Sequence, residues 1–193
     1  SGIFNFYDGI IKGNNAAITN SGGTVNIENV TLSDSNIGIS NSSGIVNIAV
    51  NVTINANNIG LSNSGTINIG TKDGNVSTEM PVITGKTYGV SNGGSGKVNF
   101  YDGIVSGESG AFSGTINEVE PGYKIVTNKN DTLTSATLTL VGDDEKVAVL
   151  NGINFTSLQD AINSASDTNE SIITLYKDVT FESNITVPAN KNI

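Results

Sequence analysis

The feature of this sequence that most constrains its fold is a repeat of about 21 residues in the first half. Two asparagine series mark the repeat: Asn5, Asn26, Asn47, Asn68 and Asn99 form the first, and Asn20, Asn41, Asn63 and Asn92 form the second. The first series steps by 21 residues three times and then by 31, and the second steps by 21, 22 and 29. A fixed period of this length is typical of a solenoid, in which each repeat is one coil stacked on its neighbours.

Each repeat contains three short segments in which apolar and polar residues alternate. One repeat has Val46-Asn47-Ile48, Val52-Thr53-Ile54 and Ile59-Gly60-Leu61-Ser62-Asn63. Alternation over so few residues is typical of strands. The sequence therefore predicts an all-β fold, a right-handed parallel β-helix with three short strands in each rung of about 21 residues. Residues 70–81 are extra length in the fourth repeat, and we expect a protruding loop there.

The two asparagine series are expected to have different structural roles. Asn5 and its equivalents lie between two inward apolar residues, so their side chains are expected to face outward. Asn20 and its equivalents precede Ser or Gly at a corner, where Asn tolerates left-handed backbone. Stacked asparagines can hydrogen-bond from rung to rung. We therefore interpret both series as structural ladders rather than as ligand-binding sites.

The repeat fades after residue 116, and the remaining sequence has a different pattern. Asn151-Gly152 lies between two apolar segments, which is the strongest short signal for a β-hairpin. Thr156 or Ser157 is placed to cap a short helix near 157–165. The sequence predicts three parts: 1–117 as the C-terminal rungs of one β-helix, 118–155 as a strand-and-hairpin linker, and 156–193 as a capping helix with the first strands of a following β-helix, at 172–176 and 185–187.

A family resemblance accompanies this pattern. The stretch 149–163, with Ile173-Thr174-Leu175-Tyr176-Lys177-Asp178-Val179 and Ile185-Thr186-Val187-Pro188, resembles the opening of a pectin-lyase-like β-helix. It is similar to tandem β-helix modules in large surface adhesins of Gram-positive, clostridia-type bacteria, and 99–107 resembles the rungs that close such modules. The resemblance implies that the helix covers the first coil of the next module. It does not fix a function, because the superfamily spans lyases, hydrolases, tailspikes and adhesins.

Composition excludes several function classes. The net charge is −9, and all nine basic residues are scattered lysines, so no nucleic-acid partner is expected. No apolar run approaches the roughly 20 residues of a membrane span, so direct membrane insertion is not expected. The chain has no His and no Cys, which removes the best transition-metal ligands and the usual general base. We therefore expect no metal and no cofactor.

Few residues are candidates for chemistry. Asp8 and Asp102 occupy equivalent positions about four rungs apart, too far for a catalytic carboxylate pair, and we interpret them as corner residues. Pectate-lyase-like enzymes use a basic residue, commonly Arg, to take the proton, and this chain has no Arg. Polygalacturonase-like hydrolases use several Asp on neighbouring rungs, a pattern that this chain lacks.

Two weaker candidates are binding sites rather than catalytic sites. Tyr7, Tyr88 and Tyr101 are candidates for glycan contact, and Tyr7 and Tyr101 are expected to point outward because each follows an inward phenylalanine. Asp143, Asp144 and Glu145 are a weak candidate for calcium, since they lack the spaced ligands of a dedicated loop, and a solvated turn is favoured.

These observations predict a non-enzymatic structural or adhesive segment of a bacterial cell-surface repeat protein. Its stiff β-helical stalk would display loops to a glycan or a host surface ligand. An extracellular location is expected, with signal and anchor outside this sequence. Two alternatives stay open: a fragment of a carbohydrate-active β-helix, such as a polysaccharide lyase or hydrolase, and a phage tailspike-like fibre. Both chain ends fall inside predicted solenoids, so end-to-end stacking or segment swapping is expected.

Overall fold

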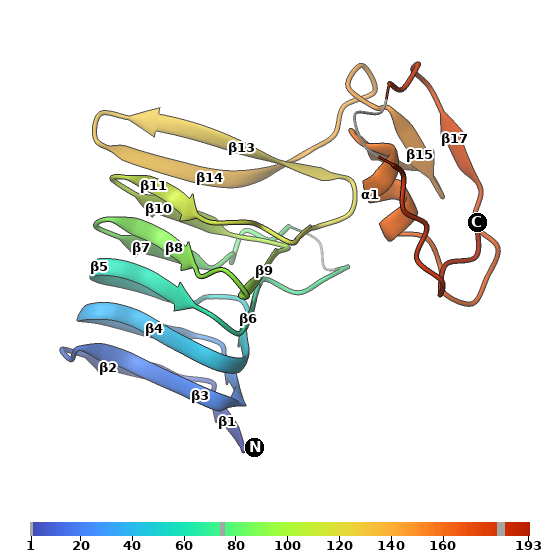
Figure 1. The fold of residues 1–193 in the computed structure, drawn as a ribbon. Coiled ribbons are helices and arrows are strands. Elements are labelled where there is room, and N and C mark those ends of the chain that lie inside the picture. Colours follow the sequence, from blue (N-terminus) through green and yellow to red (C-terminus); the bar gives the residue numbers. More distant parts are fainter. Residues whose placement is uncertain (1, 74–75, 181–183) are drawn as a thin grey trace. The chain divides into compact units, whose positions relative to one another are not determined.

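The computed structural model describes residues 2–73, 76–180 and 184–193, which form two compact units (Figure 1). Unit 1 contains Ser1–Val119 and Ile125–Leu138, and unit 2 contains Glu120–Lys124 and Thr139–Ile193. The strands of unit 1 are β1 (Ile3–Phe6), β2 (Gly9–Lys12), β3 (Ala16–Ile27), β4 (Val30–Ile48), β5 (Thr53–Asn63), β6 (Thr66–Ile69), β7 (Val82–Gly85), β8 (Tyr88–Asn92), β9 (Lys97–Phe100), β10 (Ile104–Gly107), β11 (Gly110–Ser113) and β12 (Glu118–Val119), with most of β13 (Tyr123–Asn130) and β14 (Leu133–Leu140). Unit 2 contains β15 (Ala148–Leu150), β16 (Ile153–Phe155), α1 (Leu158–Asn163) and β17 (Ile173–Leu175).

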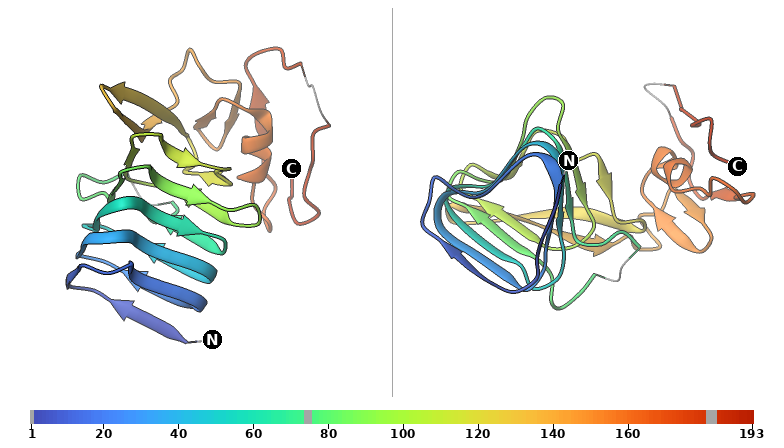
Figure 2. Two further views of the ribbon diagram at one scale, coloured as in Figure 1. Left: turned by 60° about the vertical axis from the view of Figure 1, so that its left-hand side comes forward. Right: turned by 90° about the horizontal axis from the view of Figure 1, so that it is seen from below.

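Unit 1 is a parallel β-solenoid of about five turns, as the repeat predicts. Its coils form three hydrogen-bonded ladders, which we call face 1 (β1, β3, β4, β6, β9, β12), face 2 (β2, β4, β5, β7, β10) and face 3 (β3, β4, β5, β8, β11). Pairing joins equivalent repeat positions, such as Asn26 with Asn47. Strands β3, β4 and β5 each run around a corner of the coil (Figure 2). Their pairing with the next coil continues on both sides of the corner, with a local register shift between.

Stacked apolar side chains fill the interior of unit 1. Face 1 contributes Ile27, Ile48, Ile69 and Phe100, face 2 contributes Leu32, Ile54, Ile83 and Val105, and face 3 contributes Ile39, Leu61 and Val90, all of which are fully buried. Phe100 also packs edge-on against Phe112, with ring centroids 5.3 Å apart. Burying one such side chain contributes about 1.5–3 kcal/mol, so these columns are the main stabilising contribution to the solenoid.

The hairpin of β13 and β14 closes one end of this solenoid. β14 pairs antiparallel with β10, with Ala136 opposite Val105, and Ala136 is fully buried. Ile125 and Leu138 pack against the same core. Residues 125–138, which lie within the predicted linker 118–155, therefore form a cap on unit 1. Alternation in 132–140 predicts a strand but not its direction, and an antiparallel strand ends the parallel stacking.

Unit 2 is a small antiparallel sheet packed against α1. The predicted hairpin is present, and both Asn151 and Gly152 in its turn have positive φ. The predicted helix is also present, and its N-cap is Ser157, whose side chain accepts a hydrogen bond from the Asp160 N–H at 3.4 Å. However, β17 pairs antiparallel with β15, and residues 185–187 lie outside any strand. The parallel coil expected in 156–193 is therefore not formed by its described residues. A lone coil has no neighbour on which to stack, whereas this hairpin and α1 enclose a core around Phe155.

Glycines on face 3 allow neighbouring coils to approach closely. A Cβ on Gly60 would collide with the Gly89 carbonyl oxygen and lie 2.7 Å from Ile83 Cγ2. We therefore expect Gly60→Ala to lower the free energy of unfolding by about 1–3 kcal/mol or more. Gly94→Ala is the matched control, because a Cβ there meets nothing within 4 Å. Urea unfolding followed by circular dichroism measures both variants, and equal midpoints would contradict the close packing.

Candidate functional site

The first asparagine series forms a ladder on the outside of face 1, which we call the outer ladder. Each side-chain amide donates to the asparagine of the preceding coil: Asn26 to Asn5, Asn47 to Asn26, Asn68 to Asn47 and Asn99 to Asn68, at 2.7–2.8 Å. Buried residues flank Asn26 and the three asparagines after it, so these side chains face outward as expected. Each asparagine within the ladder keeps one N–H and one carbonyl lone pair for solvent or a ligand.

The second series points into a corner of the solenoid, and we call it the inner ladder. Asn20, Asn41 and Asn63 are buried, and each donates to the next asparagine along the chain, at 3.0, 2.9 and 2.8 Å. Their other polar groups bond to the corner backbone. Asn41 Nδ2 donates to the Thr66 carbonyl at 3.1 Å, and the Gly23 N–H donates to Asn20 Oδ1 at 3.0 Å. Buried corner groups are thus satisfied by side chains of the ladder itself.

The left-handed backbone expected at the inner ladder occurs elsewhere. In unit 1 the asparagines with positive φ are Asn29 and Asn51, both at 54°, among the described residues. Asn51 Nδ2 also donates to Asn29 Oδ1 at 3.0 Å, so a short third ladder lies at this other corner. The inner ladder differs because its side chains turn inward to satisfy buried carbonyls. The repeated Asn-Val-Thr at 29–31 and 51–53 carried a signal for the third ladder that sequence reasoning missed.

The two main ladders predict different effects of the same substitution. Asn41→Ala removes buried hydrogen bonds to Asn63 and Thr66 and is expected to cost about 2–4 kcal/mol of the free energy of unfolding. Asn47→Ala removes the corresponding bonds of the outer ladder, where water can replace them, and is expected to cost less than about 1 kcal/mol. Thermal unfolding compares the two variants. Equal losses would show that burial does not distinguish the ladders.

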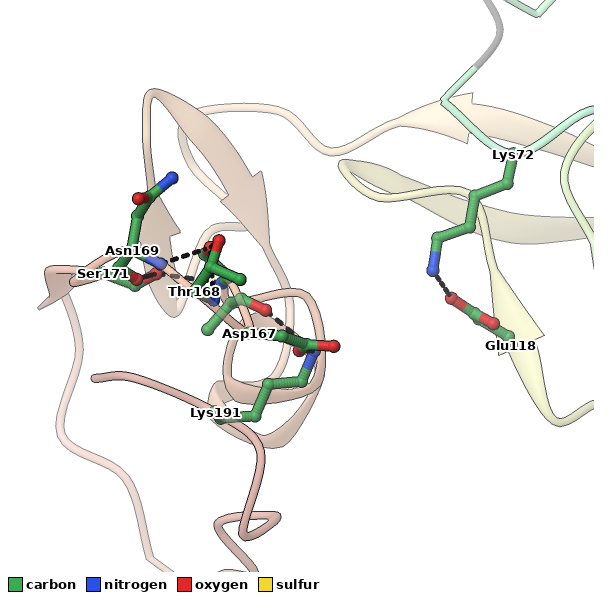
Figure 3. Close-up of polar contacts among 9 residues, drawn as sticks. Lys72, Glu118, Asp167, Thr168, Asn169, Ser171 and Lys191 are labelled. Carbon is green, nitrogen blue, oxygen red and sulfur yellow. Dashed lines mark hydrogen bonds and ion pairs between the residues drawn. The ribbon is translucent and has the colours of Figure 1, made fainter.

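Residues 70–81 connect β6 to β7, and their described residues contain no strand, as the predicted loop requires. Residues 74–75 of this loop are not among the described residues. Several contacts fasten the loop to the solenoid, among them the pair of Lys72 with Glu118 (Figure 3), the hydrogen bond from the Ser77 N–H to Asp102 Oδ2 at 3.0 Å, and the bond from the Asn51 N–H to the Glu79 carbonyl at 2.7 Å. Because the Lys72 pair is half exposed, it is worth at most about 1 kcal/mol. The contacts at Ser77 and Glu79 therefore set the position of the loop.

Asp102 and Asp8, which the repeat places at equivalent corners, differ in burial. Asp8 is exposed, but Asp102 is only 5% exposed, and its Oδ1 is buried without a hydrogen-bond partner in the described structure. Burial raises the pKa of Asp102 above its ordinary value, while backbone hydrogen bonds from Ser77 and Gly103 oppose part of this rise. The difference arises from the 70–81 loop, since Ser77 of this loop lies against Asp102.

The raised pKa of Asp102 makes stability depend on pH. Its stabilising contribution is complete below its ordinary pKa of 3.8 and is lost as the pH rises through the higher pKa of the folded state. We therefore expect Asp102→Asn to unfold at a higher temperature than the parent near neutral pH, and this advantage to vanish in acid. Asp8→Asn, at the exposed equivalent position, is expected to have no such effect. A stability difference for Asp102→Asn that does not change with pH would contradict this origin.

The three candidate tyrosines differ in exposure and do not form one aromatic platform. Tyr7 is exposed and Tyr88 is half-buried, whereas Tyr101 is 5% exposed. The Tyr101 hydroxyl donates to Glu118 Oε2 at 2.8 Å. Tyr101 is therefore covered rather than exposed to a ligand, because Glu118 on β12 of the following coil holds its hydroxyl. Tyr7, in the first coil, is the tyrosine of this set that stays available for a glycan.

The acidic turn at 143–145 is neutralised by lysines. Asp143 pairs with Lys146 at 3.0 Å, and Glu145 pairs with Lys124. The Lys146 hydrogen bond lowers the pKa of Asp143, and the Lys124 hydrogen bond lowers the pKa of Glu145. Across the described residues, no cluster of three or more acidic side chains could hold a metal ion. Two carboxylates of the weak calcium candidate at Asp143, Asp144 and Glu145 are therefore engaged in ion pairs.

A second polar cluster follows α1 in unit 2 (Figure 3). Lys191 Nζ donates to Asp167 Oδ1 at 2.6 Å and to the Ala165 carbonyl at 2.8 Å. The Ser166 hydroxyl accepts from the N–H of Asn169 at 2.9 Å. These bonds close the turn after the helix, where a cation is favoured by the helix dipole. The cluster is thus structural.

Comparisons with known proteins add no identification. No family model matches the sequence, and no curated protein or solved structure shows significant similarity to it. In the part of the chain that the structure describes, the helix is too short and polar to cross a membrane. The fold and the contacts above are therefore the basis for a functional proposal.

Proposed function

We propose that this chain is a non-catalytic structural and adhesive segment, in which a stiff β-solenoid holds the 70–81 loop for contact with a ligand. The observation that carries this proposal is that the loop interrupts the repeat and is nevertheless fastened through Asp102 and Asn51. A loop held at fixed points loses less conformational entropy on binding than a free one. The ligand class we propose is a glycan or another component of a host surface.

We infer from the links between its coils that the solenoid resists bending, which supports this role. The outer ladder and the inner ladder link consecutive coils by side chains, in addition to the backbone pairing of three faces. Their bonds keep lengths of 2.7–3.0 Å over all four coil-to-coil steps of the outer series and all three of the inner series. Regular repeats of this kind form extended, stiff stalks. The resemblance to surface adhesins leads us to propose an extracellular, bacterial cell-surface location.

Asp102 supports an anchoring role better than a catalytic one. One of its carboxylate oxygens accepts the loop N–H of Ser77, and the other is buried away from solvent. Asp8, its equivalent, is exposed in the first coil. A glycosidase-like mechanism needs two carboxyl groups within about 10 Å of each other on either side of a substrate bond. We therefore propose that Asp102 fixes the loop.

Replacing the loop tests the proposal. In the preceding coil, Ala49-Val50-Asn51-Val52 makes the same connection from face 1 to face 2 in a short turn. We expect a variant with this turn in place of 70–81 to keep its β-rich circular dichroism but to lose binding to immobilised glycans and host-cell surfaces. Arrays probed with the parent and the variant at equal concentration give the comparison. Tyr7→Ala is the matched control for a glycan contact outside the loop.

Two results would overturn this proposal. Equal binding by the parent and the turn variant would place the binding surface elsewhere, and loss of binding in Tyr7→Ala alone would place it at the first coil. Absence of binding by the parent to every glycan and cell surface would remove the adhesive part of the proposal. Depolymerisation of any array polysaccharide by the parent chain would contradict its non-catalytic part.

A further inference from the structure

The outside of face 3 carries a row of hydroxyl groups, which we call the hydroxyl row. Strand pairing places its members in register from coil to coil: Thr19, Ser40, Ser62, Ser91 and Ser113. Ser40 and Ser62 face outward, because the residues on both sides of each are buried and side chains alternate along a strand. None of the five hydroxyls has a hydrogen-bond partner among the described residues. Each is therefore available to donate and to accept.

A second row on the outside of face 3 is apolar, and we call it the apolar row. It lies three residues before the hydroxyl row and consists of Ala16, Ile37, Ile59 and Tyr88, all half-buried. A Cβ on Gly60 would lie 2.7 Å from Ile83 Cγ2 in the core, so Gly60 faces inward and Ile59 faces outward. The ring of Tyr88 leans over Gly110, where an added Cβ would lie 3.6 Å from it, and so ends the row. The two rows form a shallow strip.

The strip is uncharged, although the chain has a net charge of −9. The five segments that contain the two rows have no Asp, Glu or Lys: 14–27, 35–48, 55–69, 87–96 and 109–117. Charged residues precede face 3 at the corner from face 2, at Asp34, Lys86 and Glu108. The outside of face 3 therefore presents neutral hydroxyl groups beside aliphatic carbon.

These properties restrict the class of ligand. A nucleic acid or another polyanion binds through clustered cations, which the strip lacks. A stable protein interface has an apolar core, whereas no large apolar side chain of the two rows is fully exposed in the described structure. A sugar ring instead offers uncharged hydroxyl groups that donate and accept, together with C–H groups that pack on aliphatic side chains. An uncharged glycan matches both rows.

We propose that the outside of face 3 binds an uncharged polysaccharide chain that runs along the coils. The apolar row packs against C–H groups of the sugar rings, and the hydroxyl row exchanges hydrogen bonds with their hydroxyl groups. Neighbouring strands lie about 4.8 Å apart, so the five hydroxyls span about 19 Å and contact consecutive units of one chain. This surface is separate from the 70–81 loop, which connects face 1 to face 2, so the proposal does not depend on binding by the loop.

Removing the central hydroxyls tests this proposal. The row variant combines Ser40→Ala, Ser62→Ala and Ser91→Ala. The matched control combines Ser43→Ala, Ser64→Ala and Ser95→Ala, which removes three exposed serines of the same coils at the corner that follows face 3. Affinity electrophoresis in gels that contain dextran, mannan or soluble starch gives a dissociation constant for each variant, and polygalacturonate is the acidic comparison. Circular dichroism confirms folding, and sedimentation equilibrium gives the oligomeric state.

We expect at least one neutral polysaccharide to retard the parent, and the row variant to bind it about tenfold or more weakly than the corner control. A parent that no neutral polysaccharide retards would overturn the proposal. Equal retardation of the row variant and the corner control would place the binding surface elsewhere. Stronger retardation by polygalacturonate would contradict an uncharged ligand, and a parent dimer that the row variant dissociates would show that face 3 pairs with a second copy instead.

The variant with the short turn in place of 70–81 separates this proposal from the function of the loop. A polysaccharide that the row variant loses and the turn variant keeps is a ligand of face 3. A polysaccharide that the turn variant alone loses is a ligand of the loop, and this result would count against face 3 for that polysaccharide.

Discussion

The solenoid depends on one repeated interaction, the hydrogen bond between asparagine side chains of successive coils at a buried corner. Asn41 shows why: its amide bonds to Asn63 and to the Thr66 carbonyl, and it also accepts from Asn20. A corner that turns the chain inside a core leaves carbonyl groups without strand partners, and burying such groups unpaired is costly. The inner ladder satisfies them once in each coil. The apolar columns can therefore stack without interruption from β3 to β9.

The sequence predicted those parts of the fold that depend on periodicity. The 21-residue spacing fixed which residues pair between coils, and the alternation around Asn47 fixed which side chains face the core. Local turn chemistry predicted the hairpin at Asn151-Gly152 and the N-cap at Ser157. Each of these depends on residues adjacent in sequence or one repeat apart, so a pattern is sufficient to identify them.

Other features depend on contacts that no local pattern encodes. Tyr101 and Asp102 match Tyr7 and Asp8 in the repeat, yet the first pair is buried and the second is exposed. The difference comes from Glu118 on the following coil and from the 70–81 loop, neither of which has a counterpart near the first coil. The alternation of apolar and polar residues in β14 likewise could not predict the direction of that strand. Strand direction is set by pairing with β10 rather than by sequence within the strand.

The insertion at 70–81 shows how such a fold can take extra residues at a corner without breaking the stacking of its coils. The outer ladder crosses the insertion in a step of 31 residues from Asn68 to Asn99, with a bond of 2.8 Å, against 2.7 Å for the preceding step of 21. The inner ladder crosses it from Asn63 to Asn92, also at 2.8 Å. Which residues pair between coils thus depends on their position within the coil and not on the number of residues in a corner loop. Selection can change a corner loop while the ladders hold its two ends in register.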